Sequence, residues 1–112
     1  MYLNDGKGKF ALTNNHLPNI RHSGSCVVAA DFDHDGDLDL SRGGRLVSLQ
    51  YPKSGKSYLL KNEGRYYKNI TESFAPNLKT IGMVTSAVWA NINHDSWADL
   101  IVVGECIPIT LF

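Results

Sequence analysis

The sequence predicts an all-β fold built from repeated antiparallel units. Ten glycines, four prolines and five tyrosines in 112 residues favour short strands joined by tight turns. No stretch has a sustained apolar stripe at helical spacing; residues 71–81 come closest, and Pro76 interrupts them. The chain also repeats itself, because residues 28–40 return in similar form at 88–100. A repeat of that length suits the blades of a β-propeller better than a helical solenoid.

Two separate pairs of segments carry this repeat. Residues 28–40 match residues 88–100 at an offset of 60, and residues 3–10 resemble residues 61–66 at an offset of 58. We therefore expect two units, residues 1–58 and 59–112, whose ends fall inside strands, as in a piece cut from a longer array. The identical pairs of the first match are Ala30/Ala90, His34/His94, Asp35/Asp95, Asp39/Asp99 and Leu40/Leu100.

The strands of each unit are expected where apolar runs lie between turn residues. The first of them are residues 26–30, 38–40 and 45–50, and a hairpin of 57–61 and 66–70 follows across the boundary between the two units. In the second unit they are residues 87–90, 100–103 and 107–112.

The acidic segment between the first two expected strands carries the predicted chemistry. Alternate residues of a tight loop can turn their carboxylates toward one point, and Gly36 permits the turn that brings the Asp37 carbonyl inward. Oxygen ligands without His or Cys favour calcium or magnesium over zinc, and many ligands in a flexible geometry favour Ca²⁺. The segment has the pattern D-x-D-x-D-G-x-x-D. The expected side-chain ligands are the aspartates at its positions 1, 3, 5 and 9: Asp31, Asp33, Asp35 and Asp39.

A second loop, at residues 91–99, has the same pattern with less charge. Ser96 replaces the turn glycine, and Trp97 supplies the carbonyl at position 7. Only two of its four ligand side chains are charged, which lowers the expected affinity for a cation. Two alternatives stay open: a second calcium site, or a metal-free loop held by hydrogen bonds to the main chain. The four side chains are Asn91, Asn93, Asp95 and Asp99.

An EF-hand shares this loop spacing but needs two further features. It requires an acidic residue at position 12, where this sequence has Arg42, and it requires flanking helices. Because both are missing, we expect the loop to join two strands, with Asp39 at the start of the second.

The segment DFDHDGDLDL, residues 31–40, closely resembles the cation loop of FG-GAP/VCBS-type repeats, the blades of integrin-α-like β-propellers. Residues 60–64 and 43–45 also resemble sequence around such repeats, so the resemblance extends over residues 1–112. It implies four-stranded antiparallel blades, calcium in the inter-strand loops, and an extracellular, cell-surface or periplasmic setting. Ser41 and Arg42 depart from it, since such repeats usually continue with apolar residues there.

Two functions are compatible with this resemblance. The first is a non-enzymatic module for adhesion or interaction, in which calcium orders the loops and the surface binds a protein or glycan ligand, neighbouring propeller blades or a second copy. The second is a fragment of a propeller-type lyase or hydrolase acting on polysaccharide, with structural calcium. We favour the first and expect no catalysis, because Glu63, Glu72 and Glu105 stand alone and no G-x-S-x-G motif occurs.

Composition and charge exclude several other classes. Eleven Lys and Arg balance eleven Asp and Glu, which argues against a nucleic-acid binder. No run approaches 18 apolar residues, so no membrane span is expected, and residues 1–10 lack the apolar region of a secretory signal. The charges are uneven, however. A basic stretch at residues 42–68 follows the acidic loop, either as solvated strand faces or as a patch for anionic glycans or an acidic partner.

Two groups of side chains are left with open roles. Cys26 and Cys106 are either a disulfide or two free thiols, while His34 and His94 are expected to point away from the ion. Five aromatic residues could stack on a sugar or pack between blades, and packing is the expected role: Tyr66, Tyr67, Phe74, Trp89 and Trp97.

Overall fold

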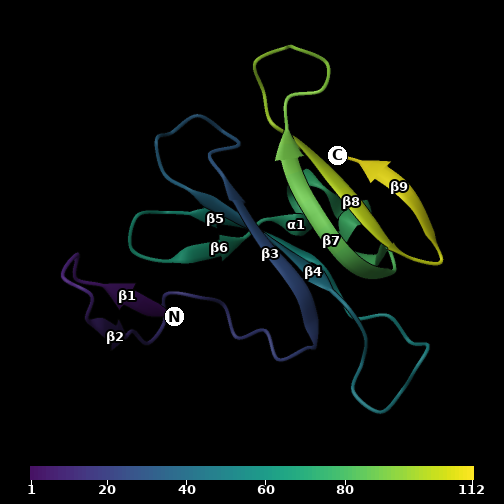
Figure 1. The fold of residues 1–112 in the computed structure, drawn as a ribbon, viewed down its shortest axis with the longest axis horizontal. Coiled ribbons are helices and arrows are strands. Elements are labelled where there is room, and N and C mark those ends of the chain that lie inside the picture. The colour runs from purple at the N-terminus through teal and green to yellow at the C-terminus, as the bar shows by residue number, and fades with distance from the viewer.

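Antiparallel β-sheet is the main regular structure of this chain. The structure is a computed structural model that describes residues 1–112. Three sheets of two, four and three strands follow one another along the chain, with a short α-helix and a 3-10 helix between the second and the third (Figure 1). The predicted all-β fold is confirmed, including one sheet with the four antiparallel strands expected of a blade. The propeller arrangement stays a prediction. No helix is long and apolar enough to cross a membrane.

The four-stranded sheet is a simple antiparallel meander in which every strand pairs with the next. The first hairpin is in register at Ala30 and Asp39, so the acidic loop connects two paired strand ends. The last hairpin pairs Asn62 with Tyr67 and confirms the hairpin predicted around residues 62–64. Its strands are β3 (Gly24–Ala30), β4 (Asp39–Gly44), β5 (Tyr58–Asn62) and β6 (Tyr67–Asn69).

The three-stranded sheet repeats the first hairpin of the four-stranded sheet. Ala90 pairs with Asp99, as the equivalent residues Ala30 and Asp39 do in the first hairpin. The same register in both hairpins places the second loop at the same end of its strands as the acidic loop. This sheet consists of β7 (Met83–Ala90), β8 (Asp99–Glu105) and β9 (Ile107–Leu111).

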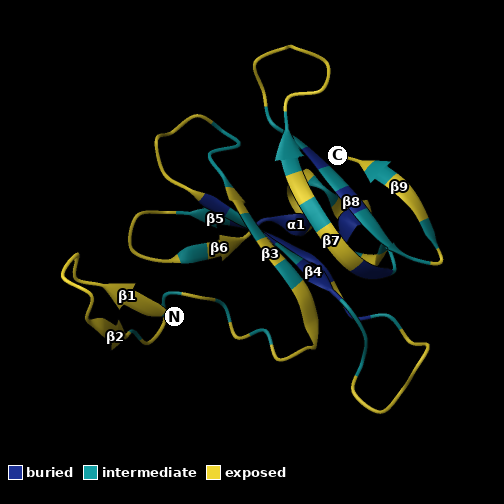
Figure 2. Ribbon diagram, in the orientation of Figure 1, coloured by how far each residue is buried: buried dark blue, intermediate teal, exposed yellow.

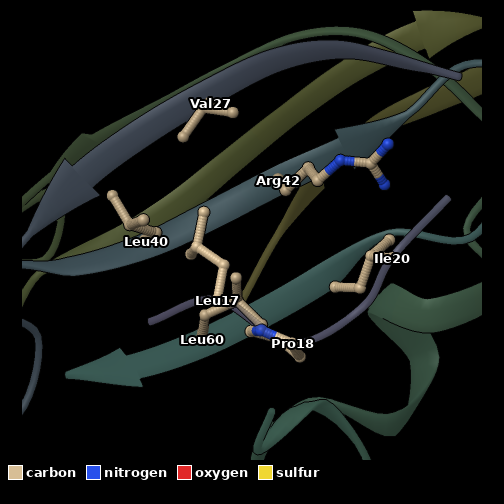
Figure 3. Close-up of a pocket in the computed structure, with 7 residues that line it drawn as sticks. All are labelled: Leu17, Pro18, Ile20, Val27, Leu40, Arg42 and Leu60. Carbon is tan, nitrogen blue, oxygen red and sulfur yellow. The ribbon is translucent and has the colours of Figure 1, made fainter. Parts of the chain in front are cut away.

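The N-terminal hairpin of β1 (Tyr2–Asn4) and β2 (Phe10–Leu12) forms a small exposed sheet to one side of the others (Figure 1). The chain that follows it crosses the outer face of the four-stranded sheet. There it encloses a mostly apolar cavity of about 170 Å³ (Figure 3). That face of the sheet is therefore partly covered by the chain's own residues, although Val27 on β3 stays 60% exposed. The cavity is lined by Leu17, Pro18, Ile20, Val27, Leu40, Arg42 and Leu60.

The main core lies between the four-stranded and three-stranded sheets, where the buried residues gather (Figure 2). The helix α1 (Thr71–Phe74) and the 3-10 helix η1 (Pro76–Thr80) lie against it, and the Thr71 hydroxyl accepts a hydrogen bond from Leu59 N–H at 2.9 Å. Proline begins η1, where a missing N–H costs nothing, so Pro76 divides this segment as expected. The core residues are Leu59, Ile70, Leu78, Val84, Leu100 and Val102.

One predicted strand is wrong. Residues 45–50 form a loop with a single isolated bridge, Leu46 to Ser54, and β4 extends to Gly44 instead. The chain turns back where Gln50 N–H donates to the Val47 carbonyl at 3.0 Å. A Cβ at Gly44 would clash with the Lys56 main-chain oxygen, so the returning chain packs directly on the end of β4 and leaves no place for a further strand. The apolar run at residues 46–49 did not reveal this close approach.

Candidate metal centre

Three carboxylates meet where β3 ends and β4 begins. Asp31, Asp33 and Asp39 each offer one oxygen, and these oxygens lie within 4.8 Å of one another. Asp39 is fully buried, while the other two are half-buried. The predicted loop therefore brings three of its four side-chain ligands together.

Asp39 anchors the loop to the neighbouring strand. Its Oδ1 accepts a hydrogen bond from Asn62 N–H on β5 at 2.7 Å, and its Oδ2 accepts one from Phe32 N–H at 3.4 Å. Burial raises the pKa of Asp39, although these two N–H groups favour the charged form. The side chain is thus held in one place before any ligand binds.

Asp31 and Asp35 shape the turn itself. The two oxygens of Asp31 accept hydrogen bonds from Asp35 N–H at 3.1 Å and Gly36 N–H at 3.0 Å. Asp35 Oδ1 accepts one from Asp37 N–H at 3.0 Å, which lowers the pKa of Asp35. Gly36 has a φ of 91°, the left-handed conformation that the sequence predicted from its position. The Asp37 side chain is exposed, as expected of a residue whose carbonyl is the proposed ligand.

The β5–β6 hairpin contributes residues that the sequence did not identify. The Lys61 ammonium contacts Asp33 and lies 3.1 Å from Asp35 Oδ2, and these carboxylates hold the pKa of Lys61 above its usual value. Asn62 Nδ2 and the Tyr67 hydroxyl both donate to the Leu38 carbonyl, at 3.3 and 3.1 Å. The only sequence feature that pointed to this hairpin was the similarity of residues 61–66 to residues 3–10. That similarity predicted a turn, but it did not predict that the turn contacts the acidic loop.

One oxygen of the cluster has no partner. Asp33 Oδ1 is buried and makes no hydrogen bond, an arrangement that is costly for a carboxylate. A cation among the three carboxylates would remove that cost, and a donor set of oxygens alone suits a hard ion. The residues present are therefore compatible with a metal ion.

The second loop repeats part of this network. Asp99 Oδ2 accepts from Ile92 N–H at 2.9 Å, and Asp95 Oδ1 accepts from Trp97 N–H at 2.8 Å, as Asp39 and Asp35 do in the acidic loop. The other oxygen of Asp95 accepts from the Asn93 side-chain amide at 2.8 Å. These bonds are of the kind expected for a metal-free loop, and both alternatives for this loop stay open.

The acidic loop contacts both β7 and the second loop through aromatic side chains. Phe32 stacks on Trp89 with ring centroids 6.1 Å apart, and His34 packs against Trp97 at 4.5 Å. Trp89 also packs against the core between the sheets, as expected for packing between units. His34 therefore faces the second loop.

The structure also shows the state of the two cysteines and the contacts of the basic stretch. Both cysteines are free, Cys26 half-buried on β3 and Cys106 exposed at the turn between β8 and β9. The basic stretch is partly used within the molecule, because Lys61 pairs with the acidic loop and Arg45 pairs with Glu105 at 2.6 Å.

Comparison with known proteins identifies part of the chain. The search of curated proteins gave no match. The search of solved structures gave none either. Residues 1–40, from the N-terminal hairpin through the acidic loop, match the family model described as FG-GAP-like repeat. The resemblance drawn from the cation loop is confirmed over this range, and the match extends no further than residue 40.

Proposed function

We propose that this chain is a calcium-binding, non-enzymatic interaction module. The observation that carries the proposal is the unpartnered, buried Asp33 Oδ1 within a cluster of three carboxylates. The family match over residues 1–40 supports it, because the loop lies inside the matched range.

The acidic loop contains the ligands for such an ion. Bound Ca²⁺ would supply positive charge to a short segment, residues 31–39, that holds five aspartates. Their mutual repulsion falls when the ion binds, so binding stabilises the folded loop. The proposed ligands are the side chains of Asp31, Asp33, Asp35 and Asp39 and the main-chain carbonyl of Asp37.

The partner surface is proposed to include both loops. They lie at the same end of their strands and meet where His34 packs against Trp97, so an ion that orders the first loop also supports the second. The proposed ligand is a protein or a glycan, or a neighbouring unit of the same kind. An extracellular, cell-surface or periplasmic setting follows from the family resemblance and is part of the proposal.

Calorimetric titration of the whole chain tests the metal site. We expect Ca²⁺ to bind with measurable heat and the isosteric substitution Asp33→Asn to remove most of it. Glu63→Gln, an equal loss of charge in an exposed turn outside the loop, should change little. A parallel titration with Mg²⁺ identifies the preferred ion. If the unaltered chain gives no heat with either ion, the proposal is wrong.

A further inference from the structure

Lys61 places a cation of the chain itself inside the acidic loop. Its ammonium contacts Asp33 Oδ2 and lies 3.1 Å from Asp35 Oδ2, so one positive charge serves two of the proposed ligands. The side chain reaches the loop from β5, the strand that also holds Asp39 through Asn62 N–H. Lys61 is therefore part of the centre rather than a surface lysine nearby.

Most of the other carboxylate oxygens of the loop already accept hydrogen bonds from main-chain N–H groups. Asp31 and Asp39 each use both oxygens on main-chain N–H groups, and Asp35 uses Oδ1 in the same way. Asp33 uses neither oxygen on the main chain. The oxygens most available to an ion are thus those of Asp33 and the Oδ2 of Asp35, two of which Lys61 contacts.

We infer that Lys61 is an internal competitor of the divalent ion: its ammonium holds the loop together without metal and must leave the two carboxylates when metal binds. This inference rests on the proposed function. It adds that ion binding exchanges one cation in the loop, the Lys61 ammonium, for another. The exchange lowers the affinity for the ion and makes the metal-free loop more stable.

The effect of Lys61 on affinity has a definite sign. Because the ion must displace the Lys61 ammonium from two carboxylates, loss of that ammonium should tighten Ca²⁺ binding about tenfold or more. The same substitution should lower the melting temperature of the metal-free protein, because the aspartates then repel without compensation.

Lys61→Met tests both effects on the whole chain. We expect a lower Kd for Ca²⁺ and a lower Tm in the presence of chelator. Lys68→Met is the matched control, because Lys68 pairs with Lys61 across the β5–β6 hairpin and is exposed. Lys61→Arg, which keeps the charge, should resemble the unaltered protein. Unchanged or weaker binding by Lys61→Met would overturn the inference and leave the calcium site intact.

A second measurement needs no variant. Amine-reactive labelling followed by mass spectrometry should show Lys61 modified faster when Ca²⁺ is present, while Lys68 is modified at the same rate. Equal labelling of Lys61 with and without bound Ca²⁺ would overturn the inference even if Lys61→Met failed to fold. Absence of any Ca²⁺ binding by the unaltered chain would instead overturn the proposed function, and the inference with it.

Discussion

Arg45 and Glu105 form an ion pair at 2.6 Å although they occupy equivalent positions of the two units. Arg45 follows β4 of one sheet, and Glu105 ends β8 of the other, so the contact joins the two sheets. Glu105 also accepts a hydrogen bond from the Tyr51 hydroxyl at 3.1 Å. Because the two equivalent positions carry opposite charges, the two units attract each other at this point.

The ion pair should contribute modestly to the free energy of unfolding. About a third of each side chain is exposed, so solvent screens the attraction. A double-mutant cycle with Arg45→Met and Glu105→Gln should give a coupling energy of about 0.5–1 kcal/mol by urea denaturation. Additive effects of the two substitutions would show that the pair does not stabilise the contact between the sheets.

Tyr51 should titrate above its ordinary pKa of 10.0, because its hydroxyl donates a hydrogen bond to the charged Glu105. The folded protein then holds the phenolic proton more tightly than the unfolded chain does. The resulting stability is complete below about pH 10 and is lost as the pH rises through the pKa of folded Tyr51. Ultraviolet titration of the phenolate should show that Glu105→Gln lowers this pKa; an unchanged curve would argue against the bond.

Substitutions in the acidic loop should separate side-chain ligands from the main-chain ligand. Asp35→Ala should abolish the calcium-dependent increase in stability, whereas Asp37→Ala should leave most of it. For the unaltered protein, that increase should be about 2.7 kcal/mol when calcium exceeds its Kd a hundredfold, and a chelator should reverse it. Thermal unfolding with and without calcium measures the difference. Equal losses in both variants would mean that the ligand positions are wrongly assigned.

Substitutions at the turn residues of the two loops, Gly36 and Ser96, should change the stability of the protein in opposite directions. Ser96 has a φ of 75°, which is unfavourable for a residue with a side chain, while Gly36 adopts 91° without that cost. Ser96→Gly should therefore raise the stability of the metal-free protein by up to about 1 kcal/mol, and Gly36→Ala should lower it by about 1–2 kcal/mol. Chemical denaturation tests both changes. A loss of stability in Ser96→Gly would show that the serine side chain has a stabilising contact.

The parts of the site that could be predicted are those encoded locally. The acidic loop could be identified because its oxygens alternate within one short segment, and its position between strands followed from Arg42 at position 12. Lys61 and Tyr67 could not be assigned, since they reach the loop from a separate hairpin later in the chain. Residues 45–50 were wrongly expected to form a strand because a short apolar run does not show where a returning chain packs against Gly44.

The contact between His34 and Trp97 has a consequence for how such a chain can evolve. A substitution that reshapes the acidic loop moves the His34 ring, against which Trp97 packs. A substitution that reshapes the second loop moves the Trp97 ring in the same way. The two copies of the motif therefore cannot diverge independently: changes tolerated in one are limited by the conformation of its neighbour.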